Sequence, residues 1–208
     1  MMNELISRYP CLEACKDDII AATDAIIDCY KKGGKVLLCG NGGSCADCDH
    51  IVGELMKGFL KLRPLSEEKK AEMKKNCDLI DDEILNKLQD ALPAVSLPSI
   101  TALNSAFCND VDPELIYAQP LMSLARENDI LIGISTSGNS KNVYGAVKVA
   151  KALGIKVIGL TGKSGGKLKE CADIAVCVPE TETFKIQELH LPVYHYICAA
   201  TEEYFFKN

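Results

Sequence analysis

The sequence predicts an α/β fold in which helices cover both faces of a five-stranded parallel β-sheet. Four apolar, β-branched runs, at residues 35–39, 130–134, 155–160 and 174–178, are followed by small or polar turn residues. Continuous apolar runs of this length are typical of parallel strands that are buried on both faces. Because helical patterns separate the runs, we expect a three-layer sandwich.

The helices of this sandwich are predicted from the spacing of apolar residues. The first thirty residues carry isoleucine and alanine at helical intervals, which indicates a helix on the outside of the sheet or against another subunit. Further helical patterns follow the strands at residues 46–59, 142–153 and 185–206. Residues 94–97 are a shorter candidate for the fifth strand.

A charged segment interrupts this alternation. Residues 61–90 are rich in Glu, Lys and Asp but keep helical periodicity, so we predict a helical insertion at about residues 61–92 of a single domain spanning residues 1–208. A solvated helical excursion is the favoured interpretation. A lid over a binding site is the alternative.

Size and charge limit the possible functions. A chain of 208 residues is about one domain long, and its net charge of −6 comes without any block of basic residues. General binding to nucleic acid or to an anionic membrane is therefore not expected. The sequence has no apolar run long enough to span a bilayer, and its N-terminus has no signal-peptide pattern, so we expect a cytoplasmic protein.

The chain has 11 cysteines, most of them inside apolar stretches. With an odd count and no export signal, we interpret them as reduced core residues. Cys45 and Cys48, with Cys39 and His50 nearby, are an alternative redox pair or structural zinc site. A structural zinc site usually needs a second pair of ligands, and the sequence offers no obvious one.

Two loops have the composition of anion sites. The first strand runs into Gly40, Asn41, Gly42, Gly43 and Ser44 before a helix, and glycines at a helix N-terminus let backbone N–H groups face an anion. This loop has Cys45 where a dinucleotide-binding loop has its third glycine, and residues 162–164 lack the first glycine of a Walker A loop. We therefore expect no nucleotide cofactor.

The second loop is richer in hydroxyl groups. Ser135, Thr136, Ser137 and Ser140 lie between a buried strand and a helix, and together they can donate several hydrogen bonds to one phosphate. The loop has no lysine or metal-binding acid, which suits a phosphate ester held as a handle rather than one being transferred. A capped, serine-rich turn is the structural alternative.

His50 and Glu54 lie four residues apart on the helix after the first loop, so their side chains share a face. A carboxylate base and a histidine suffice for the proton transfers of an aldose–ketose isomerisation. Of the 3 histidines, His190 and His195 share the last helix but point in different directions, and His190 is better explained as a core or interface residue. A surface ion pair is the plain alternative for His50 and Glu54.

Five motifs, in this order and spacing, resemble the phosphoheptose isomerases of the SIS family. The resemblance covers nearly the whole chain outside the insertion, and it rests on these stretches: GNGGSCADCDHIVGEL, CNDVDPELIYAQPL, GISTSGNSKNV, LTGKSGGKL and KIQELHLPVYHYI. It implies the SIS fold, a homotetramer with active sites between subunits, and conversion of sedoheptulose 7-phosphate to a glycero-manno-heptose 7-phosphate.

The same resemblance implies a role for each matching residue. Glu54 and His195 match the catalytic pair, and Ser135, Thr136, Ser137 and Ser140 match the phosphate loop. The remaining substrate contacts fall on Asn41, Gly42, Ser44, Asp110 and Gln187. Some such isomerases carry zinc, which here implies the ligands His50, Glu54, Gln187 and His195.

Two features complicate these implications. Gly58 stands where the family usually has an arginine, and Gln187 and His195 are eight residues apart, about 12 Å along a helix. Pro192 could kink that helix, or two subunits could supply the two residues. A SIS tetramer that binds a protein such as the replication initiator, and an isomerase for another phosphosugar, are the alternative functions.

Overall fold

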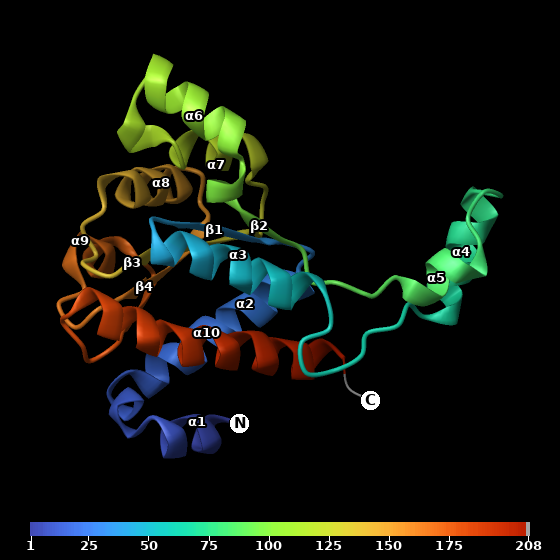
Figure 1. Cartoon of the computed structure of the whole chain (residues 1–208), viewed down its shortest axis with the longest axis horizontal. Coiled ribbons are helices and arrows are strands. Elements are labelled where there is room, and N and C mark those ends of the chain that lie inside the picture. The colour runs from blue at the N-terminus through green and yellow to red at the C-terminus, as the bar shows by residue number, and fades with distance from the viewer. Residues whose placement is uncertain (207–208) are drawn as a thin grey trace.

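The computed structural model describes residues 1–206 and contains the predicted sandwich (Figure 1). Its five strands are all parallel and lie in the order β2-β1-β3-β4-β5. The strands are β1 (Val36–Gly40), β2 (Ala94–Ser96), β3 (Ile130–Ser135), β4 (Lys156–Thr161) and β5 (Ile174–Cys177). The weak candidate at residues 94–97 is thus confirmed as an edge strand.

One helical layer packs on the first face of the sheet. It contains α2 (Lys16–Lys31), α3 (Gly43–Met56) and α10 (Thr183–Phe205), with α1 (Met2–Arg8) outside them. The N-terminal helix is broken, because Pro10 begins a 3₁₀ turn that separates α1 from α2. Alternate strand residues such as Val36 and Leu38 point into this layer and form its core.

The second layer covers the opposite face, where Leu37 and Leu131 meet the other core. It contains α6 (Thr101–Asp110), α7 (Ala118–Leu124), α8 (Lys141–Ala152) and α9 (Gly166–Cys171) (Figure 1). Short 3₁₀ turns at Leu97–Ser99 and Pro113–Leu115 precede α6 and α7. Helix α6 lies at the outside of this layer, and it has no buried residue.

The charged segment leaves the body after α3. It forms α4 (Glu67–Asn76) and α5 (Asp82–Lys87), which Figure 1 shows to one side of the layers. The N-caps of these helices are Ser66 and Asp81. Helix α4 buries no residue, and Leu79 is 91% exposed. These features favour the solvated excursion over a lid.

The excursion closes on itself at its base. Pro64 and Gln89 form an isolated antiparallel bridge, and the amide of Asp90 donates to the carbonyl oxygen of Arg63 at 2.7 Å. The chain therefore leaves and re-enters the body at nearly the same place.

The strand order places the two polar loops together. The chain passes from β1 through α3 to β2 on one side, and from β3 through α8 to β4 on the other. The connections thus diverge between β1 and β3, which are direct neighbours with Gly40 opposite Ile134. In open parallel sheets, ligands bind beyond the carboxyl ends of the strands at such a switch point.

The 11 cysteines are all free thiols. Burial raises the pKa of Cys39 to about 12 and that of Cys48 well above its ordinary value. Cys15, Cys29, Cys39, Cys48 and Cys198 are buried among apolar residues, which confirms the interpretation as core residues for these five. No helix within residues 1–206 is both long and apolar enough to cross a membrane.

Candidate active site

A reciprocal amide pair joins the two polar loops. Nδ2 of Asn41 donates to Oδ1 of Asn142 at 2.8 Å, and Nδ2 of Asn142 donates to Oδ1 of Asn41 at 2.9 Å. The hydroxyl of Tyr117 lies 2.8 Å from the carbonyl oxygen of Gly40 and 2.9 Å from Oδ1 of Asn41. The first loop is therefore tied to the start of α8 and to the segment before α7.

The first loop turns sharply into α3. Gly42 has a φ of 56°, a left-handed conformation that favours glycine, and Ser44 is buried with its amide 3.0 Å from the carbonyl oxygen of Asn41. A Cβ atom at Gly43 would lie 2.4 Å from Nε2 of Gln187. The amide of Gln187, from α10, thus packs directly against the first turn of α3.

The second loop is a compact turn that carries several hydroxyl groups. Oγ of Ser135 and Oγ of Ser140 are 2.9 Å apart, and the amide of Asn139 donates to Oγ of Ser137 at 3.2 Å. Ser137 is exposed, whereas Ser135 is buried. Gly138 has a φ of 67° and would place a Cβ only 1.9 Å from the carbonyl oxygen of Gly165, so only glycine fits there.

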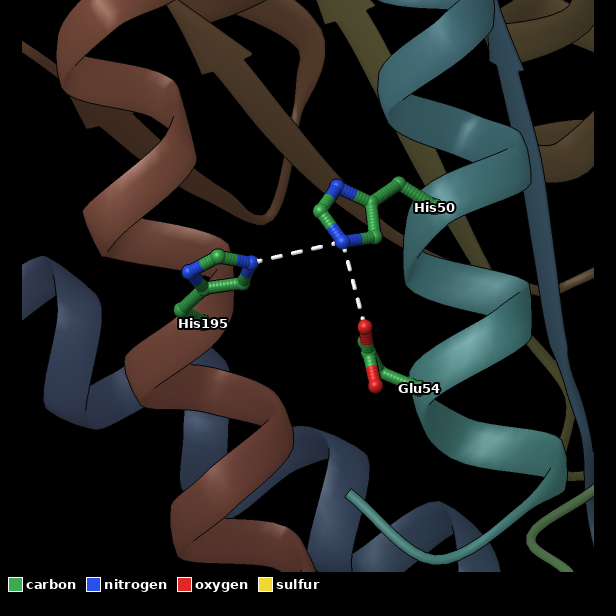
Figure 2. A group of neighbouring side chains, drawn as sticks. All are labelled: His50, Glu54 and His195. Atoms are coloured by element: carbon green, nitrogen blue, oxygen red, sulfur yellow. Dashed lines mark hydrogen bonds and ion pairs between the residues drawn. The ribbon is translucent and has the colours of Figure 1, made fainter. Parts of the chain in front are cut away.

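Further along α3, three side chains converge from two helices (Figure 2). Nε2 of His50 lies 3.1 Å from Oε1 of Glu54 and 3.5 Å from Nε2 of His195. One ligand atom from each residue lies within 4.8 Å of the others. The structure thus brings both residues of the predicted pair on α3 together with His195 from α10, all in one chain.

The surroundings of His195 shift its protonation equilibrium. Burial, and then the neighbouring His50, lower the pKa of His195 below its ordinary value. Nδ1 of His50 is 2.9 Å from the hydroxyl of Tyr194, and the ring of Phe59 lies 5.4 Å from that of His195. Nζ of Lys57 lies 3.4 Å from Oε2 of Glu54, whereas His50 contacts Oε1. The lowered pKa makes protonated His195 a stronger acid than an ordinary histidine, and its neutral form can accept a proton or bind a metal ion.

The other predicted residues lie apart from this group. Gln187 contacts Gly43, which precedes His50 by seven residues, about 10 Å of helix. Asp110 ends α6 in the opposite layer, where its carboxylate accepts from Nδ2 of Asn109, and it is not part of the His–Glu–His group. His190 is fully buried, which confirms its prediction as a core residue.

Several neighbours of the site were missed from sequence. Tyr117 and Asn142 support the first loop, Tyr194 contacts His50, and a buried Arg63 donates to the carbonyl oxygens of Glu54 and Leu55. The contacts of Tyr117, Asn142 and Tyr194 join residues more than 70 positions apart in the chain, so no local pattern marks them. The one available signal was Arg63, a charged residue next to Pro64 between two leucines.

Comparison with known proteins identifies the family of the chain. Two profiles of the SIS domain match residues 3–89 and 102–197, so the fold and its loops define a SIS-domain protein. A phosphoheptose isomerase of a Nitratiruptor species is 38% identical over 193 residues, which are 93% of this chain and 89% of that protein. The chain belongs to the phosphoheptose isomerase family.

Solved structures lead to the same family. The structure of a phosphoheptose isomerase from Francisella tularensis is similar with a TM-score of 0.77 and 32% identity, over 94% of this chain and 91% of that one. A phosphoheptose isomerase from Neisseria gonorrhoeae matches with a TM-score of 0.76 and 30% identity, over 97% of this chain and 94% of that one. The predicted fold and family are therefore both confirmed.

Proposed function

We propose that this chain is an aldose–ketose isomerase that converts sedoheptulose 7-phosphate to a glycero-manno-heptose 7-phosphate. The observation that carries the proposal is the convergence of Glu54 and His195 from α3 and α10, with α3 beginning at the first polar loop and the Asn41–Asn142 pair joining that loop to the second. A sugar phosphate has its phosphate and its carbonyl group at opposite ends. Helix α3 offers a separate site for each end.

The phosphate end is assigned to the loops. Ser135, Thr136, Ser137 and Ser140 supply hydroxyl groups, and the N-terminus of α8 supplies backbone N–H groups and the positive end of its dipole. The first loop is joined to that loop by the amide pair of Asn41 and Asn142, and it contributes Asn41, Gly42 and Ser44. We assign Gln187 to the substrate, because its amide packs beside this first loop. Asp110 remains a substrate contact by family resemblance only.

The carbonyl end is assigned to the His–Glu–His group. Glu54 takes a proton from C1 of the ketose while His195 gives a proton to the oxygen on C2, which yields an enediol. Reversal on the other carbon, with a proton returned to C2 and one removed from the oxygen on C1, completes the aldose. His50 contacts Oε1 of Glu54 and not Oε2. Oε2 can therefore accept the substrate proton while Oε1 keeps its contact with His50.

The same three side chains fit a zinc ion. Zinc bonds of ~2.0–2.1 Å in a tetrahedron put neighbouring ligand atoms about 3.3 Å apart. The separations of 3.1 Å and 3.5 Å at Nε2 of His50 lie on either side of this value. Three protein ligands with an open fourth position are typical of catalytic zinc. Bound there, the ion would supply the positive charge that polarises the carbonyl group in place of the proton from His195.

Gln187 fits the substrate role better than the role of a fourth ligand. Its amide packs at the first turn of α3, whereas the histidines lie about two turns further along. We therefore propose His50, Glu54 and His195 as the zinc ligands.

We also infer a homotetramer. Helix α6 buries nothing in the isolated chain, and Val111 just beyond it is 64% exposed. An open cavity of about 450 Å³ between α1 and α10 is lined mostly by apolar residues, together with Glu4, Arg8 and His195. Apolar surfaces of this kind favour contact with further subunits. Sedimentation at micromolar concentration should give four chains, and a fully active monomer would contradict the assembly.

A panel of ketose phosphates tests the function. We expect the wild-type chain to form aldose fastest from sedoheptulose 7-phosphate. Glu54→Gln should lower kcat by about 10²–10⁴-fold with an unchanged fold. Glu127→Gln, in the loop before β3 at the other end of the sheet, is the matched control and should keep full activity. Activity on no ketose phosphate, or full activity of Glu54→Gln, would overturn the proposal.

A further inference from the structure

The hydroxyl group of Tyr194 lies between His50 and a second acidic residue of α3. It is 2.9 Å from Nδ1 of His50 and 3.3 Å from Oδ1 of Asp47. Tyr194 is 2% exposed, and its ring packs edge-on against the rings of both His50 and His195. Asp47 and His50 are one turn apart on α3, so α10 inserts a single phenol between them.

The direction of these hydrogen bonds follows from counting protons. An ionised carboxylate only accepts, and a phenol has one proton, so Tyr194 donates that proton to Asp47. The phenol oxygen can then accept from Nδ1–H of His50. This arrangement needs a metal ion rather than a proton between Nε2 of His50 and Oε1 of Glu54, because the Glu54 carboxylate also only accepts. The other oxygen of Asp47, Oδ2, is buried and has no partner among the described residues, so this carboxylate relies on the hydrogen bond from Tyr194.

We propose that Asp47 and Tyr194 are positioning residues that hold His50 with its proton on Nδ1 and its Nε2 lone pair toward Glu54 and His195. This inference rests on the proposed zinc site. A lone pair on Nε2 is the form in which a histidine ligates a metal ion, and outer partners that fix this form commonly strengthen metal binding. Without that bond, the His50 proton can move to Nε2 and block the ligand position.

Tyr194→Phe tests the proposal with little loss of packing. We expect the zinc dissociation constant, measured by competition with a zinc indicator dye, to rise by about 10–100-fold. Tyr196→Phe, two residues further along α10, is the matched control and should bind zinc as the wild-type chain does. Circular dichroism and thermal unfolding establish that both variants fold.

Asp47→Leu tests the direction of the bonds without changing the phenol. In this variant Tyr194 has no carboxylate to donate to, so its proton turns to Nδ1 and drives the His50 proton onto Nε2. Zinc binding should weaken although Tyr194 is intact. Unchanged zinc affinity in both Tyr194→Phe and Asp47→Leu would overturn the proposal.

A spectroscopic measurement separates this proposal from the zinc site itself. The chain has 3 histidines, so ¹⁵N-labelled histidine gives few ring signals to assign. At pH 8 without metal, Glu54 favours a proton on Nε2 of His50 and the Tyr194–Asp47 pair favours one on Nδ1, so the fraction of neutral His50 with its proton on Nδ1 should be higher in the wild-type chain than in Asp47→Leu. Absence of zinc binding in the wild-type chain would reject the metal site alone. An equal fraction of the Nδ1 form in the wild-type chain and in Asp47→Leu would reject the roles of Asp47 and Tyr194.

Discussion

Arg63 and Glu202 form a completely buried ion pair, with Nε of Arg63 2.8 Å from Oε1 of Glu202. The guanidinium group also donates to the carbonyl oxygens of Leu55 and Glu54, while Glu202 accepts from the amides of Phe59 and Leu60. The pair therefore fastens the end of α3, the start of the excursion and α10 to one another. The backbone of the proposed base Glu54 belongs to this assembly.

Removal of Arg63 should destabilise the chain strongly. Arg63→Met leaves the Glu202 carboxylate buried without its charge partner, which typically costs about 3–5 kcal/mol of unfolding free energy. Lys87→Met is the matched control, because it breaks the exposed pair between Lys87 and Glu83 and should cost less than about 0.5 kcal/mol. Denaturant titration measures both. Equal losses of unfolding free energy in the two variants would mean that the buried ion pair stabilises the chain no more than an exposed one.

The serine loop should govern affinity for phosphate. Ser137→Ala combined with Ser140→Ala removes two hydroxyl groups from the proposed handle, each worth about 1.5–3 kcal/mol toward a charged group. We expect KM and the inhibition constant of inorganic phosphate to rise together. Ser123→Ala, at an exposed position of α7, should change neither. If the double variant keeps both constants, the phosphate lies elsewhere.

Mixing inactive variants should not restore activity. Glu54 and His195 approach each other within a single chain, so an exchanged assembly of Glu54→Gln and His195→Asn subunits has one damaged residue at every site. A tagged mixture in which exchange is verified by mass spectrometry provides the assay. Wild-type subunits exchanged into Glu54→Gln are the positive control. Recovery in the mixture of the two variants would show that the pair forms between subunits.

His190 should make the fold sensitive to acid. Burial lowers the pKa of His190 from 6.5 to about 4, because removal from water disfavours the charged ring. Between pH 6.5 and pH 4, His190 is protonated in the unfolded chain but not in the folded chain. The free energy of unfolding therefore falls as the pH drops through this range. The loss from this residue approaches about 3 kcal/mol.

His190→Leu isolates this contribution, because all carboxylates titrate alike in both chains. As the pH falls from 7 to 4, the unfolding free energy of the wild-type chain should decrease by more than that of His190→Leu. A difference that stays constant with pH would contradict the assignment to His190.

The sheet was predictable because its evidence is local. A strand buried on both faces must be apolar along its length. The apolar runs at residues 130–134 and 155–160 therefore indicate such strands directly. Helices α6, α7 and α9 were not predicted, because short helices that bury few residues leave little periodicity. The break between α1 and α2 at Pro10 was overlooked, although proline at the start of a new turn is a known signal.

The site was predictable in part for the same reason. His50 and Glu54 are neighbours along one helix, and their spacing is visible in the sequence, whereas His195 was assigned only through family resemblance. The contact of Tyr194 with His50 joins residues 144 positions apart, and that of Arg63 with Glu202 joins residues 139 apart. Contacts of that kind depend on how α10 crosses α3, and only the folded chain shows it.

The closed base of the excursion makes this segment a module. Since the chain departs at Pro64 and returns at Gln89 across a single bridge, the residues between can lengthen, shorten or be replaced while α3 and β2 keep their places. In evolutionary terms this is a point where insertions cost little and new surfaces can arise. For laboratory use it is an internal attachment point, where a fluorescent protein or an affinity tag can be inserted between α4 and α5, away from the bridge at the base and from either terminus.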